Sequence, residues 1–423
     1  MNIRIRCIEL SILLAALAAG YSAAAETAPE PIAVNALVEQ ALNANPGLKA
    51  ARQRWSAELE RPAQAKALPD PQLTVSQMTE KLETRAGPLQ GKVGVSQRFP
   101  FFRKRALQSE TASWEAKVAE AAYRSAQLKV RAQVIGAYYD LYYLNRAADI
   151  LGEQVGFLRH FARVAEKKYA VGKGAQAMVF RAQAELSRLQ NDVITAEQEA
   201  KSVRARLNAL LNRKPWAEVG KPQAPEFPKL RWEVEKLRER ALRERPELQA
   251  LAALEGKTEA QRKLAFKRFF PDFLVGYEWT RIGAGTTMSS FDGKDAHGLS
   301  IGLNLPIWGG SLKAAHREAE AREKAASLSR ADLVNRTLAE LEDLAVRAET
   351  SVRLAKVDEE SILPQIRAAL QSTLSGYESD AVGFLDLLDA ERALLNLELG
   401  HERHKVMFHQ VVAELERVVG GEI

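Results

Sequence analysis

The 423-residue chain has very little of the residue types that carry most protein chemistry. It contains one cysteine, Cys7, together with six histidines and five methionines. Cys7 lies in an N-terminal segment that we expect to be removed, so the mature chain would have no thiol for disulfides, thiol catalysis or zinc. A phosphate-binding Gly-Lys loop and a nucleophile elbow are missing as well. The sequence therefore predicts neither an enzyme nor a cofactor or metal site.

Long apolar runs are also scarce. The one at the N-terminus follows Arg4 and Arg6, covers residues 10–19 and ends near the small residues 23–25. This order is typical of a secretory signal peptide, which we expect to be cleaved after residue 25. Cys7 precedes the apolar stretch, so it is not a lipoprotein cleavage site. No later run has the ~18 residues of a transmembrane helix, so an exported chain of this kind could enter a membrane only as a β-barrel.

Charge of one sign is not concentrated anywhere in the chain. The 60 lysines and arginines outnumber the 54 acidic residues, which gives a net charge of +6, and positive and negative residues alternate throughout. This pattern is typical of the surface of long solvated helices. A nucleic-acid-binding protein would need a concentrated basic face, so no nucleic-acid partner is expected.

The sequence contains two copies of one unit. Motifs recur about 200 residues apart: Ala41-Leu42 with Pro46 as Ala241-Leu242 with Pro246, and Pro69-Asp70 as Pro271-Asp272. Each copy is predicted to run as short helix, strand, polar loop, strand, very long helix, turn and long helix. The predicted division is a signal peptide at 1–25, a first repeat at 26–213, a linker at 214–232 with several prolines, and a second repeat at 233–423.

Two short segments in each copy alternate apolar and polar residues, which predicts strands with one apolar face. The strands are predicted at 72–78, 92–99, 273–280 and 299–305, with polar loops at 79–91 and 282–297. Strands of a membrane barrel have this pattern, although a soluble sheet packed on a core would share it. The residues predicted to face lipid are Val93, Val95, Phe273, Val275, Tyr277, Trp279, Leu299, Ile301 and Leu303.

Very long helices follow the strands. No proline interrupts residues 103–168, and apolar residues, many of them alanine, recur there at the spacing of a coiled coil. About 65 helical residues extend about 100 Å, which exceeds an ordinary globular domain. Shorter returning helices are predicted at 175–213 and 384–418.

Four strands cannot close a barrel, and lipid does not tolerate open sheet edges, so several chains must pool their strands. Two chains would give eight strands around a filled interior, whereas three would give twelve strands with room for a pore. The predicted fold class is therefore mainly α with β. Each chain contributes four strands to a trimeric twelve-stranded outer-membrane β-barrel, which a long α-helical coiled-coil barrel continues.

The chain resembles the TolC-type outer-membrane efflux channels across residues 34–418. The segments that carry the likeness are Ala41 to Pro46, Leu68 to Pro71, Gln97 to Pro100, Leu305-Pro306, Ile362 to Gln365 and Tyr377 to Glu391. The resemblance implies a homotrimer in the bacterial outer membrane with a long periplasmic part. It also implies a passive exit duct without a cofactor, partnered by a periplasmic membrane-fusion adaptor and an inner-membrane RND-type transporter.

The segment Gln97 to Lys104 is most similar to the heavy-metal branch of this family. Heavy-metal cations are therefore the expected substrate, with drugs as an alternative. Two other functions stay open, a type I secretion outer-membrane duct and a periplasmic coiled-coil adaptor protein.

The resemblance also implies roles for the helix ends. Asp386 and Asp389 lie three residues apart on one helix face and would line the periplasmic aperture as cation-selecting groups, unless they are merely exposed aspartates near a helix start. Tyr377 would help hold the aperture shut, although Met178 stands where its aspartate partner is expected. The tips expected to contact the adaptor are Val171, Gly172, Lys173, Gly174, Asp380 and Gly383.

One pair of histidines has a spacing compatible with a metal. His401 and His404 are three residues apart on a predicted helix. Since no third ligand is fixed nearby, they are predicted to be helix surface.

Overall fold

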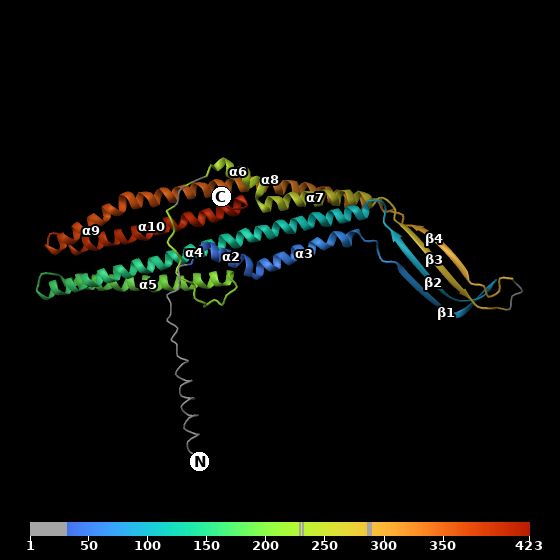
Figure 1. Cartoon of the computed structure of the whole chain (residues 1–423), viewed down its shortest axis with the longest axis horizontal. Helices are drawn as coiled ribbons and strands as arrows, with labels where there is room; N and C mark the ends of the chain where they lie inside the picture. Colours follow the sequence, from blue (N-terminus) through green and yellow to red (C-terminus); the bar gives the residue numbers. More distant parts are fainter. Residues whose placement is uncertain (1–31, 228–229, 231, 286–289) are drawn as a thin grey trace, which may run out of the picture.

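The computed structural model describes residues 32–227, 230, 232–285 and 290–423, so the predicted signal peptide lies outside the described residues. The molecule is elongated, with long helices lying side by side and a four-stranded sheet that extends from one end at an angle to them (Figure 1). The C-terminus lies beside the middle of the helical body, far from the sheet (Figure 1).

The helical elements follow the predicted duplicated order. They are α2 (Val34–Ala44), α3 (Pro46–Lys66), α4 (Lys104–Ala170), α5 (Gln176–Leu210), α6 (Val234–Glu244), α7 (Pro246–Lys267), α8 (Gly309–Val357), the π-helix η1 (Asp358–Ile362), α9 (Leu363–Glu378) and α10 (Phe384–Val419). Pro46 and Pro246 each begin a helix, where a missing N–H costs nothing, and separate it from the short helix before it. None of the helices in the described part of the chain has the length and apolarity needed to cross a membrane.

α4 is the central helix of the body and packs against α3, α5, α7 and α10. Its 67 residues extend about 100 Å at 1.5 Å per residue. Buried side chains occur along its whole length, from Leu107 to Ala165, because its apolar stripe follows the helical period. The core is consequently divided along the body, with one cluster around Tyr138 and Leu207 and another around Phe161 and Phe384.

The sheet has the order β1-β2-β3-β4, and all neighbouring strands are antiparallel. Its strands are β1 (Gln72–Thr84), β2 (Gly87–Phe99), β3 (Phe273–Ile282) and β4 (Ala296–Leu303). The central β2–β3 pair joins the first repeat to the second. The fold class is therefore as predicted for the single chain, mainly helical with four strands.

The predicted loop at 79–91 is wrong. β1 and β2 continue through it to a tight turn at Arg85 and Ala86, and their register shifts between Gln77 and Leu82. The polar residues of this segment hid the strand because they interrupt the alternation of apolar and polar side chains. β4 also ends at Leu303, two residues before the predicted end.

The second long helix has an interruption that the sequence did not predict. The π-helix η1 separates α8 from α9 just before Pro364. Proline has no N–H to donate into the preceding turn, and a wider turn is one way for a helix to accommodate it.

Candidate functional site

One face of the sheet is apolar across all four strands. Cross-strand partners form rows on it, and two of the rows include a polar residue: Leu73, Val95, Tyr277 and Leu299; Val75, Val93 and Trp279 with His297; Val275 and Ile301 with Gln97; and Phe99 and Phe273 with Leu303. All the residues predicted to face lipid therefore share this face. Leu299 and Ile301 are 76% and 74% exposed, so the chain itself does not cover it. Contact with lipid stays a prediction.

The opposite face of the sheet is polar and rich in glycine. Ser96, Gly276 and Ser300 lie in one row, and Gly94, Glu278 and Gly298 in the next. Lys92 donates a hydrogen bond to Glu278 at 3.0 Å across β2 and β3. Over residues 32–227, 230, 232–285 and 290–423, β1 and β4 each have a partner strand on one side only, so both edges of the sheet are unpaired there.

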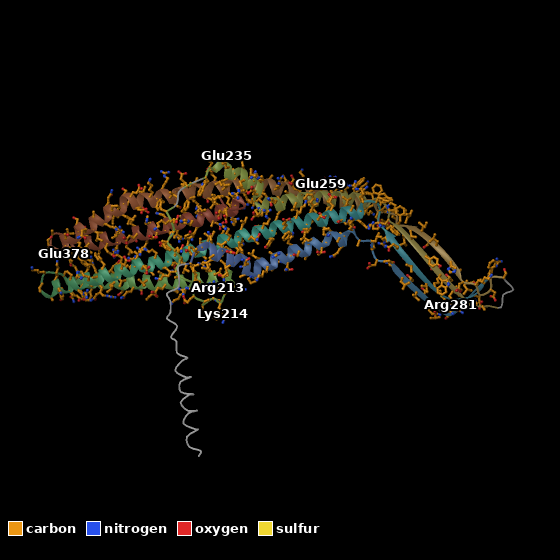
Figure 2. The ribbon with its side chains drawn as sticks, viewed as in Figure 1. Arg213, Lys214, Glu235, Glu259, Arg281 and Glu378 are labelled. Carbon is orange, nitrogen blue, oxygen red and sulfur yellow. The ribbon has the colours of Figure 1, made fainter. Side chains whose placement is uncertain are left out.

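The two helical hairpins end together at the opposite end of the molecule from the sheet. Figure 2 shows Glu378 at this end and Arg281 near the far end of the sheet. The α4–α5 turn contains Gly172 with φ +72°, and the α9–α10 turn contains Asp380 with φ 60°. Val171 and Asp380 are exposed on these turns, as predicted tips should be, but adaptor contact stays a prediction.

Lys168 joins the two hairpins. Its Nζ donates hydrogen bonds to the Asp380 carboxylate at 2.5 Å and to the Tyr377 carbonyl at 2.8 Å. It also lies 4.2 Å from the centre of the Tyr377 ring, a cation–π contact. The ammonium of Lys168 lowers the pKa of Asp380, so the carboxylate stays charged. Sequence reasoning missed Lys168, because its partners lie more than 200 positions away in the chain.

Tyr377 is buried between the hairpins. Its ring packs against Phe161 of α4 and Phe384 of α10, with ring centres 6.4 and 5.8 Å apart. Burial raises the pKa of Tyr377, so the hydroxyl stays neutral. Met178 packs against the same cluster. Tyr377 therefore holds the two hairpins of one chain together, and its part in closing an aperture stays a prediction.

Asp386 and Asp389 lie on the exposed side of the first turns of α10. The Asp386 carboxylate accepts a hydrogen bond from the Gly383 N–H at 3.2 Å, which caps the start of the helix. Asp389 is 3.8 Å from Arg392, whose guanidinium binds both oxygens of Glu185 on α5. Both aspartates are thus available to solvent or to another chain, and their role at an aperture stays a prediction.

Glu391 is a buried carboxyl group that sequence reasoning did not assign. It is 1% exposed, and neither of its oxygens has a hydrogen-bond partner among the described residues. Burial, with the charge of Glu185 nearby, raises the pKa of Glu391 to about 7. A signal existed in the sequence, because Glu391 shares the helical spacing of the apolar residues Phe384, Leu387 and Leu394, which are buried.

The two histidines of α10 have separate environments. His404 Nδ1 lies 2.8 Å from the carboxylate of Asp358 in η1, whereas Nδ1 of the buried His401 has no hydrogen-bond partner in the part of the chain that the structure describes. Over the described residues, no group of three or more His, Cys, Asp and Glu side chains is arranged to hold a metal ion. His404 is therefore partly buried and bonded to Asp358 rather than fully exposed helix surface.

Comparison with known proteins decides the family. A profile of the family described as "Outer membrane efflux protein" matches residues 37–213 and 237–421. The chain belongs to this family. As an outer membrane efflux protein it is a channel component located in the outer membrane with a periplasmic helical part, and it is not an enzyme. The alternative of a periplasmic adaptor is thereby set aside.

Two curated relatives of this outer membrane efflux protein have informative names. "Cobalt-zinc-cadmium resistance protein CzcC" of Cupriavidus metallidurans is 22% identical over 402 residues, which cover 92% of this chain and 90% of the relative. "Toxin and drug export protein A" of Aggregatibacter actinomycetemcomitans is 24% identical over 219 residues, which cover 51% of this chain and 47% of that protein.

Solved structures share the fold. The outer membrane protein VceC of Vibrio cholerae superposes with a TM-score of 0.77 at 21% identity, covering 92% of this chain and 96% of its own. CusC, described in the context of transmembrane channel formation, gives a TM-score of 0.76 at 17% identity, with 93% and 94% covered. These structures confirm the predicted fold.

Proposed function

We propose that this outer membrane efflux protein is the passive exit duct of a tripartite efflux pump. Three chains would pool their strands into a twelve-stranded barrel, and their helices would continue it as a periplasmic tunnel. The observation that carries the proposal is the sheet, which exposes one apolar face and whose two edge strands have no further partner strand among the described residues. Each unsatisfied backbone group costs several kcal/mol in lipid, so β1 and β4 would pair with the edges of neighbouring copies.

Heavy-metal cations are the proposed substrate. The support comes from the relative named for cobalt, zinc and cadmium resistance and from the exposed Asp386 and Asp389 at the hairpin end. Threefold symmetry would gather these carboxylates around the axis, and a ring of acidic groups attracts cations and repels anions. The first repeat has Met178 and Arg181 at the equivalent positions, so only the second repeat would supply acid.

The proposed partners are a periplasmic membrane-fusion adaptor and an inner-membrane RND-type transporter. The hairpin tips are the proposed adaptor contact, since Val171 is apolar yet 69% exposed on its turn. An exposed apolar side chain at a tight turn can be buried against another protein.

A type I secretion duct is the second candidate. It is favoured by the relative named as a toxin and drug export protein, which this chain matches over about half of that protein's length. The two functions can be distinguished in cells that carry this gene together with its own pump genes. A metal-efflux duct would allow these cells to export metal ions, whereas a secretion duct would allow them to export a protein.

The aperture proposal is tested by replacing Asp386 and Asp389 together with asparagine. The purified protein in a planar bilayer should lose several-fold in cation-over-anion permeability, measured from the reversal potential in a salt gradient. The matched control replaces Asp332 and Asp343, two exposed aspartates of α8 far from the hairpin tips, and should change nothing. Equal selectivity in both double variants would remove Asp386 and Asp389 from the conducting path.

A further inference from the structure

A groove lies where the helical body meets the sheet. Its lining includes Lys66, Leu68, Phe99, Phe102, Arg103 and Arg105, and its volume is about 330 Å³. We call it the collar groove. In Figure 1 this is the level at which the sheet extends from the helices at an angle.

The apolar half of the collar groove continues the apolar face of the sheet. Phe99 pairs with Phe273, which pairs with Leu303 at the end of the last apolar row. Beyond this row, Phe102 is 76% exposed. The last apolar row of the sheet therefore leads into the groove, because Phe99 and Phe273 also belong to its lining.

The other half of the groove is cationic. Lys66, Arg103 and Arg105 all line it, and none of them forms an ion pair with a residue in the described part of the chain. Arg105 Nη1 donates a hydrogen bond to the Lys66 carbonyl at 2.9 Å, which fixes its direction. The neighbouring Lys104 is different, because it pairs with Asp272 at 2.7 Å. No acidic residue belongs to the lining of the groove.

The second repeat provides an internal comparison. After β4, Leu305, Ile307 and Trp308 are 70%, 71% and 77% exposed, which repeats the apolar surface that follows β2. The next residues are Gly309, Gly310 and Ser311, where the first repeat has Arg103, Lys104 and Arg105. The second repeat therefore builds its helix-to-sheet junction without cations at these positions.

We propose that the collar groove binds an anionic phospholipid of the periplasm-facing leaflet, with the lipid phosphate on Arg103, Arg105 and Lys66 and the acyl chains on the apolar sheet face. Guanidinium groups suit this ligand because they bind phosphate oxygens through two parallel hydrogen bonds. An inorganic phosphate would leave the apolar half of the groove unused. The inference rests on the proposed function in one respect, that the apolar sheet face meets lipid.

The test is native mass spectrometry of the detergent-extracted mature protein, titrated with phosphatidylglycerol or with phosphatidylcholine of the same acyl chains. The wild type should retain phosphatidylglycerol several-fold better, and a Lys66→Gln, Arg103→Gln, Arg105→Gln variant should lose that preference. The control variant replaces Lys313, Arg317 and Lys324, exposed bases of α8, with glutamine and should keep it. Arg103→Gly alone provides a milder change, since Arg103 has φ 68°, a conformation that glycine adopts without strain.

Other outcomes would overturn the inference. If the wild type is trimeric and retains both lipids equally, the proposed lipid site in the collar groove is wrong, but the proposed duct function is not affected. Competition by millimolar inorganic phosphate would make the groove a free-phosphate site. If the triple groove variant is monomeric, the collar groove would be a contact surface between chains instead of a lipid site. A wild type that is monomeric and retains neither lipid would contradict the proposed function itself.

Discussion

Lys168 is the residue that connects the two halves of the hairpin end, through Asp380, the Tyr377 carbonyl and the Tyr377 ring. Lys168→Met should keep the aliphatic packing and lose all three polar contacts. We expect amide hydrogen exchange of residues 376–383 to accelerate several-fold, because local opening depends on such contacts. Lys167→Met, a change at the exposed neighbouring lysine, should leave the exchange rates unaltered.

The charge pair predicts a pH dependence of the same segment. Lys168 lowers the pKa of Asp380, so the stabilisation from this contact is fully present above the ordinary pKa of an aspartate and is lost as the pH falls through the lowered pKa of the folded chain. Exchange of residues 376–383, corrected for the intrinsic pH effect, should therefore rise in acid in the wild type and stay flat in Lys168→Met. A flat wild-type profile would show that the ion pair does not hold the turns.

Glu391 predicts a pH dependence of opposite sign. Its pKa in the folded chain, about 7, lies above the ordinary value of 4.5, so the folded state holds this proton more tightly than the unfolded state. The penalty for burying it is absent below about pH 4.5, grows as the pH rises toward 7 and is complete above 7. Glu391→Gln should therefore raise the apparent melting temperature at pH 8, by an amount that corresponds to about 1–3 kcal/mol.

The check is a pair of thermal melts at pH 5 and pH 8. The difference between the two melting temperatures should shrink in Glu391→Gln relative to wild type. Glu378→Gln, an exposed glutamate at the hairpin end, is the control and should keep the wild-type difference. An unchanged difference in Glu391→Gln would mean that water or a neighbouring chain solvates the carboxylate.

At the scale of the elements, the sheet gives the sharpest expectation because register separates its faces. Val275→Arg or Ile301→Arg would place a charge on the apolar face, at a cost of about 2–4 kcal/mol near the bilayer midplane. Gly298→Arg adds the same side chain to the polar face beside Glu278. We expect the first two variants to reach the outer membrane in much lower amounts, measured by membrane fractionation, and Gly298→Arg to reach it normally. Normal assembly of all three would contradict the lipid-facing assignment.

The elements also show how far the sequence alone leads. The long helices could be predicted because an uninterrupted heptad stripe specifies both their length and their buried face. The outer half of the β1–β2 hairpin could not be predicted, since polar side chains interrupt the alternation of apolar and polar residues there. η1 was missed because one wider turn leaves the apolar period on either side of it intact. Contacts such as Lys168 with Asp380 depend on how two hairpins align, which local periodicity does not encode.

At the scale of the whole molecule, the single chain leaves several apolar surfaces uncovered besides the sheet. Phe180 and Ile194 on α5, and Leu328, Val346 and Leu354 on α8, are between 43% and 63% exposed. The body is about 100 Å long and its core is divided into separate clusters. The apolar area buried within one chain therefore does little to offset the unfavourable exposure of these side chains. Packing of α5 and α8 against neighbouring chains would cover these side chains while β1 and β4 pair.

Light scattering of the detergent-extracted mature chain, with the detergent mass subtracted, should therefore give three chains per particle. Val346→Lys with Leu354→Lys should shift the mass toward one chain, because two buried charges at the contact between copies would each need a partner. Glu349→Lys, at an exposed position outside the i, i+4 stripe that contains Val346 and Leu354, should stay trimeric. A monomeric wild type would leave the edges of β1 and β4 unpaired in lipid, which the backbone hydrogen-bonding requirement does not allow, and the pooled duct would have to be abandoned.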